Sequence, residues 1–138
     1  MTSRLDAETI LLIDDDELIL RATKMALEHN GFNVKTALGG IEGIRVFKED
    51  PEGVRAVVLD FAMPDMDGKD VFHALREIRL DLPIFIYTGC TMVDVQARFG
   101  DITPTGFIQK PLRVQHLVRL LAGLPNARRT SPAKNTAS

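Results

Sequence analysis

Three short, unbroken apolar runs constrain the fold of this chain more than any other feature of its sequence. They lie at residues 10–13, 56–59 and 83–87, and they read Ile-Leu-Leu-Ile, Ala-Val-Val-Leu and Pro-Ile-Phe-Ile-Tyr. Polar residues do not alternate with apolar ones inside these runs, so neither side of such a strand suits contact with water. Runs of this kind are typical of strands buried on both faces of a parallel sheet.

Amphipathic helical patterns lie between these runs, and weaker strand patterns occur at residues 32–36 and 105–109. The spacing predicts helices near residues 18–29, 41–47, 68–78, 92–99 and 114–121. In the first of them, Leu18, Ala22, Met25 and His29 follow helical spacing, and Ile19 and Ala26 widen this apolar stripe. Strand and helix alternate five times, which predicts an α/β domain with a parallel sheet and helices on both faces.

Length and composition fit one globular domain. The 138 residues are 45% hydrophobic and 26% charged, and we expect the domain to occupy residues 8–123. Residues 126–138 contain no large apolar side chain, so we expect residues 124–138 to form a disordered tail.

The net charge of −2 argues against a nucleic-acid-binding surface. No apolar run has the length of a membrane span, and with no secretory signal and one cysteine, Cys90, we expect a cytoplasmic location.

Polar residues occur where the predicted strands end. Asp14 and Asp15 follow the first strand, Asp60 ends the third, Thr88 ends the fourth and Lys110 ends the fifth. The carboxyl ends of parallel strands share one edge of a sheet, and open α/β sheets bind ligands at that edge, where the strand order reverses. Side chains spread over almost the whole domain are therefore expected to converge on one pocket.

The charges of these residues predict a divalent cation in the pocket. Asp14, Asp15 and Asp60 bring three negative charges together, and Lys110 offsets only one of them. Oxygen ligands without a nearby Cys or His suit a hard cation, and we expect Mg²⁺. We assign the neighbouring Asp16 instead to capping the helix that follows.

An aspartate in such a pocket can act as a nucleophile toward phosphorus. Asp60 would then form an acyl phosphate, while the cation and Lys110 stabilise the charge on the phosphoryl oxygens. Thr88 can offer its hydroxyl to one of these oxygens. The new charge of roughly −1.5 to −2 would be enough to reorder nearby loops.

At this level of detail the chain resembles the receiver domains of bacterial two-component response regulators. The resemblance covers roughly residues 8–123 and rests on four segments in the correct order: Leu12–Asp16, Val58–Gly68, Ile86–Gly89 and Gly106–Pro111. It implies a flavodoxin-like (βα)5 fold, a doubly wound parallel sheet with strand order 2-1-3-4-5.

The resemblance also implies roles for individual residues. Asp60 would accept a phosphoryl group from the phosphohistidine of a histidine kinase. Asp15, Asp60 and the backbone carbonyl of Ala62 would bind Mg²⁺, with Asp14 acting through a water molecule. Thr88 and Phe107 would move together on activation, and the Lys110–Pro111 peptide bond would be cis. The protein would thus be a signalling phosphoacceptor that assists its own phosphoryl transfer and hydrolysis, and not an enzyme acting on other substrates.

The resemblance names partner classes and a partner surface. The phosphodonor would be a histidine kinase or the transmitter of a hybrid kinase, and the recipient a histidine phosphotransfer protein or an output protein. The face formed by residues 92–99, Phe107 and the last helix is the candidate partner surface, and phosphorylation-dependent dimerisation is left open. The short ending after the last helix is similar to receivers that stand alone and to receivers at the C-terminus of hybrid kinases.

Departures from the family pattern bear on the switch and on the lifetime of the phosphoryl group. Phe107 stands where many members carry Tyr, and Gly89 replaces a common Ala. Ala62 and Cys90 occupy the two positions that tune hydrolysis in the family, and neither side chain can orient water well. We therefore expect a long-lived phosphoryl state.

Two other functions compete with this interpretation. A haloacid-dehalogenase-type phosphohydrolase also uses a strand-end aspartate, but it needs a second aspartate two residues later, where this chain has Ala62. A pseudo-receiver keeps the fold without phosphorylation and usually loses an acidic or lysine position. None of those positions is lost here.

Overall fold

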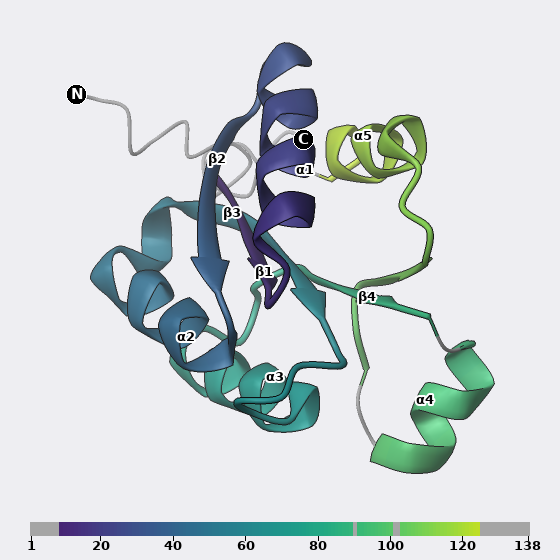
Figure 1. The fold of residues 1–138 in the computed structure, drawn as a ribbon. Coiled ribbons are helices and arrows are strands. Elements are labelled where there is room, and N and C mark those ends of the chain that lie inside the picture. Colours follow the sequence, from purple (N-terminus) through teal and green to yellow (C-terminus); the bar gives the residue numbers. More distant parts are fainter. Residues whose placement is uncertain (1–8, 90, 101–102, 125–138) are drawn as a thin grey trace, which may run out of the picture.

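Five parallel strands form one sheet in the computed structural model, which describes residues 9–89, 91–100 and 103–124 (Figure 1). The strands are β1 (Thr9–Asp14), β2 (Asn33–Leu38), β3 (Val54–Asp60), β4 (Ile84–Thr88) and β5 (Gly106–Gln109). The helices are α1 (Glu17–His29), α2 (Gly40–Glu49), α3 (Gly68–Ile78), α4 (Met92–Phe99) and α5 (Val114–Ala122), and a 3-10 turn, η2 (Pro51–Gly53), precedes β3. The strand order is β2-β1-β3-β4-β5, so the predicted flavodoxin-like topology is confirmed.

The sheet separates two hydrophobic cores, as expected for strands buried on both faces. Alternate residues of the strands face α1 and α5 on one side, and the remaining strand residues pack with α2, α3 and Val95 of α4 on the other. All five residues of β4 are buried, and in β3 only Arg55 is partly exposed. The strand order reverses between β1 and β3, which places the expected ligand crevice at their carboxyl ends.

Helix α1 forms where it was predicted but buries a different face. Leu20, Thr23 and Leu27 point into the core, whereas Leu18 is 74% exposed and Met25 is 70% exposed. The apolar stripe read from the sequence is therefore not the buried face, although Ile19 at its margin packs against the core. Apolar residues occupy two overlapping stripes of this helix, and only packing against the sheet selects between them.

Helix α2 contains glycines because it packs closely against its neighbours. A Cβ atom at Gly43 would lie 2.5 Å from Cδ1 of Ile13, and one at Gly40 would lie 2.6 Å from Cγ2 of Val71. These glycines lower the intrinsic helix propensity of the segment. In return, they allow the helix backbone to approach β1 and α3.

Two expectations fall partly outside the described residues. The disordered tail was predicted for residues 124–138, of which only Leu124 is described, and Cys90 is not described either. The domain boundary at residues 8–123 therefore stays a prediction. Among the described residues, no helix has both the length and the apolar composition needed to cross a bilayer.

Candidate functional site

The predicted polar residues converge on one edge of the sheet. Asp14 ends β1, Asp60 ends β3, Thr88 ends β4 and Lys110 follows β5. Asp14 and Lys110 each lie one residue from the predicted position relative to their strand, and all four residues lie at the predicted edge. One carboxylate oxygen from each of Asp14, Asp15 and Asp60 lies within 4.8 Å of the other two. The parallel register causes this convergence, because it pairs Ile13 with Leu59 and thus brings the ends of β1 and β3 side by side.

Asp60 is the most enclosed carboxylate of this site. Its side chain is 1% exposed, and its Oδ1 accepts a hydrogen bond from the backbone amide of Ala62 at 3.1 Å. The ammonium nitrogen of Lys110 lies 3.5 Å from the same oxygen. A buried anion held by one amide and one ammonium group is thus fixed in place and retains a second carboxylate oxygen for chemistry.

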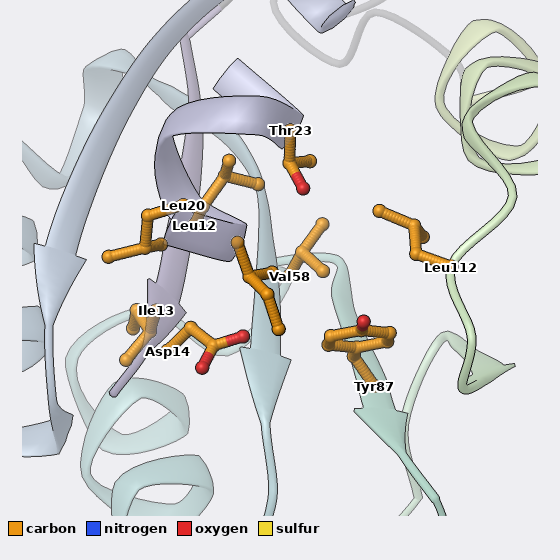
Figure 2. Close-up of a pocket in the computed structure, with 9 residues that line it drawn as sticks. Leu12, Ile13, Asp14, Leu20, Thr23, Val58, Tyr87 and Leu112 are labelled. Atoms are coloured by element: carbon orange, nitrogen blue, oxygen red, sulfur yellow. The ribbon is translucent and has the colours of Figure 1, made fainter. Parts of the chain in front are cut away.

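Asp14 lies beside Asp60 and is poorly neutralised. Its Oδ1 accepts a hydrogen bond from the amide of Asp16 at 3.0 Å, while its buried Oδ2 has no partner among the described residues. Burial first, and the charge of Asp60 second, raise the pKa of Asp14 to about 7. Figure 2 shows this carboxylate on one side of a cavity of about 20 Å³, across from Tyr87.

The carboxylates fit the predicted divalent cation. Asp14 supplies a buried oxygen without a partner, Asp15 is exposed beside it, and Asp60 completes the group. An all-oxygen set of this charge suits Mg²⁺ better than a softer metal. Asp16 does not belong to this group: its Oδ1 accepts hydrogen bonds from the amides of Leu18 and Ile19, which confirms its capping role.

Lys110 reaches the carboxylates from the end of β5. Its backbone amide donates to the carbonyl of Thr88 at 2.8 Å, and the Lys110–Pro111 peptide bond is cis, as predicted. The ammonium nitrogen also lies 4.9 Å from the centroid of the Tyr87 ring. Lys110 therefore contacts both the buried anion and an aromatic face.

The two predicted switch residues occupy neighbouring strands. Thr88 is buried at the end of β4, and Phe107 is half-buried on β5, where it packs against the core on the side of α2 and α3. The Cα partner of Phe107 is Ile86, two residues before Thr88. Thr88 and Phe107 thus project from adjacent strands toward the same side of the sheet, where coupled movement is sterically feasible.

Asp65 has a role that the sequence analysis missed. Its carboxylate accepts hydrogen bonds from the first two amides of α2, those of Gly40 and Ile41, at 3.1 and 3.2 Å. Gly39 precedes this helix with a φ of 99° and offers no capping side chain. Asp65 thus fastens the loop after Asp60 to α2, and no local pattern could reveal a cap that comes from 24 residues away.

Comparisons with known proteins agree with this geometry. Residues 10–122 match the family model of the response regulator receiver domain. The response regulator MprA of Mycobacterium sp. (strain KMS) is 32% identical over 89% of this chain and 52% of its own length. The probable transcriptional regulatory protein TcrX of Mycobacterium tuberculosis is 34% identical over 84% of this chain and 49% of its own length. The chain thus spans about half the length of these curated relatives.

Solved structures show the same fold. A response regulator receiver domain protein from Clostridium thermocellum is similar with a TM-score of 0.77 and 30% identity, over 83% of this chain and 91% of that one. A response regulator receiver protein from Sinorhizobium medicae gives a TM-score of 0.74 and 30% identity, over 90% and 98%. The chain therefore belongs to the response regulator receiver domain family of two-component signal transduction.

Proposed function

We propose that Asp60 is the phosphoacceptor of this receiver domain, and that its phosphorylation switches the domain between two signalling states. The observation that carries the proposal is a carboxylate that is 1% exposed, with a lysine ammonium at 3.5 Å and two more carboxylates within 4.8 Å. This arrangement favours attack on an electrophile that brings its own negative charge and needs neutralising groups around it.

The side chains divide the chemistry between them. A carboxylate oxygen of Asp60 attacks phosphorus, the bond between phosphorus and the donor nitrogen breaks, and the donor histidine leaves with that electron pair. The Lys110 ammonium and the Thr88 hydroxyl stabilise the phosphoryl oxygens. Asp14, Asp15, Asp60 and the carbonyl of Ala62 would hold Mg²⁺, which supplies charge neutralisation when bound.

A conformational switch would follow from the charge placed on Asp60. Thr88 would move toward a phosphoryl oxygen, and Phe107 would turn into the space that Thr88 leaves. Their positions on adjacent strands support this coupling. With Ala62 near the acceptor, no carboxylate or amide at that position orients a water molecule for hydrolysis, which supports a long-lived phosphoryl state.

The phosphodonor would be a histidine kinase or a hybrid kinase transmitter, and a histidine phosphotransfer or output protein would receive the signal. The exposed Leu18 and Met25 offer apolar contact area for such a partner on α1, the helix that begins three residues after Asp14. The face of α4, β5 and α5 remains the candidate partner surface expected from the sequence, including for a phosphorylation-dependent dimer. We place the protein in the cytoplasm, as a signalling domain without affinity for nucleic acid.

The test is to incubate the protein with Mg²⁺ and acetyl phosphate and to measure its intact mass. We expect a single phosphoryl adduct that disappears with EDTA or in the Asp60→Asn variant. The matched control is Asp67→Asn, which removes an exposed carboxylate that caps α3. An adduct that survives Asp60→Asn would refute the assignment. If no adduct forms even with beryllofluoride as a phosphoryl analogue, a pseudo-receiver is favoured.

A further inference from the structure

Tyr87 lies between Asp60 and Lys110, the two residues that the proposed chemistry brings together. In the sheet register its Cα partner is Asp60 on one side and Ile108 on the other. Lys110 follows Ile108 by two residues, and side chains two apart in an extended chain point to the same face. The Lys110 side chain must therefore cross the position of Tyr87 to reach Asp60.

The contacts of Tyr87 match this placement. The Lys110 ammonium lies 4.9 Å from the ring centroid and 3.5 Å from Oδ1 of Asp60. Leu112, two residues after Lys110, also lies beside the Tyr87 side chain. The tyrosine is only 6% exposed, and Figure 2 shows Tyr87 and Leu112 lining the same pocket. The ring is thus largely buried, and the Lys110–Leu112 segment runs beside it.

A fixed aromatic face matters because a lysine side chain is flexible. Its four-carbon stem allows many rotamers, and the Lys110 side chain is 32% exposed, so water competes for the ammonium group. The face of an aromatic ring attracts a cation, and the attraction grows as water is excluded. Tyr87 therefore narrows the positions available to the ammonium group to those near Asp60.

We propose that Tyr87 is a positioning residue, which holds the Lys110 ammonium beside Asp60 so that phosphoryl transfer depends on an aromatic ring at position 87. This inference rests on the proposed role of Asp60. The face of the ring stabilises one geometry of the lysine side chain. The hydroxyl group contributes only to the orientation of the ring.

The first experiment is a double-mutant cycle on the rate of adduct formation with acetyl phosphate and Mg²⁺. Tyr87→Leu should slow the reaction by roughly three- to tenfold, the size expected for a partly exposed cation–π contact. Tyr87→Phe, which keeps the ring, should retain the rate within about twofold. In a Lys110→Met background, Tyr87→Leu should have no further effect, because the ring would have no cation to hold.

The matched control is Phe85→Leu, which shrinks a buried aromatic residue on the same strand and in the same core. It should change stability without the Lys110-dependent loss of rate. Equal rates for Tyr87→Leu and the wild type would overturn the proposal. It would also be overturned if Tyr87→Leu slowed the reaction by the same factor with and without Lys110, as expected for general damage to the fold.

A second measurement does not depend on phosphorylation. The chain has one tyrosine and no tryptophan, so protein labelled with 3-fluorotyrosine gives a single ¹⁹F resonance, that of residue 87. Lys110→Met should shift this resonance, whereas Lys48→Met, on the exposed surface of α2, should not. An unchanged resonance in Lys110→Met would refute the contact. A wild-type protein that forms no Asp60-dependent adduct but shows the shift would refute the proposed function alone.

Discussion

Replacing Asp14 by asparagine should stabilise the metal-free protein. Burial and the charge of Asp60 raise the pKa of Asp14 from 3.8 to about 7. At about 1.4 kcal/mol per pKa unit, this shift of about three units corresponds to roughly 4 kcal/mol of unfavourable free energy when Asp14 is ionised in the folded state. Asparagine has nearly the same shape and carries no charge, so it removes this term.

The sign of the pH dependence follows from the direction of the shift. The folded state binds the proton of Asp14 more tightly than the unfolded state, so stability falls as the pH rises from about 4 to about 7. Above that range the full penalty applies. At pH 8 in EDTA we expect Asp14→Asn to be more stable than the wild type by roughly 2–4 kcal/mol, and at pH 5 by about 1 kcal/mol.

Urea denaturation, with the midpoint and slope fitted separately, measures this difference. Asp15→Asn is the matched control, because Asp15 is exposed and its loss should change stability much less. Added Mg²⁺ should make the wild type more stable than Asp14→Asn, because the metal stabilises the protein that keeps all three carboxylates. An Asp14→Asn variant that is no more stable than the wild type at pH 8 in EDTA would show that the buried charge carries no such cost.

Three further predictions test individual contacts. Asp65→Ala removes the cap of α2 and should lower the unfolding free energy by about 1 kcal/mol in urea denaturation, and an unchanged midpoint would contradict the capping role. Gly43→Ala should destabilise the protein by roughly 1–3 kcal/mol in the same assay, because its Cβ would lie 2.5 Å from Ile13; the gain of a few tenths usual for alanine in a helix would refute this. Thr88→Ala should slow adduct formation with acetyl phosphate by roughly tenfold, as expected for one hydrogen bond to a charged group, and an unchanged rate would exclude the hydroxyl from the reaction.

The residues at strand ends could be predicted from the sequence because parallel pairing determines where they lie. Once the runs before Asp14 and Asp60 are recognised as adjacent buried strands, their carboxylates must meet. The same logic places Thr88 and Lys110 at that edge. Site residues that follow directly from sheet topology need no knowledge of side-chain packing.

Contacts that depend on packing could not be predicted in this way. Leu18 and Met25 satisfy a helical period, yet they face solvent, because a neighbouring stripe of α1 fits the sheet better. Asp65 caps α2 through the amides of Gly40 and Ile41, which precede it in the sequence by 25 and 24 positions. In the sequence, Tyr87 looks like one more apolar residue of a buried strand, and only the structure shows that the Lys110 ammonium lies over its ring.

The central claim is that Asp60 carries the phosphoryl group, and the most direct measurement identifies the modified residue. Borohydride reduces an acyl phosphate and converts the acceptor aspartate to homoserine, which peptide mass spectrometry then locates. After reaction with acetyl phosphate and Mg²⁺, we predict homoserine at position 60 and at no other position. Homoserine at Asp14 or Asp15, or a phosphoryl adduct that gives no homoserine at all, would contradict the account.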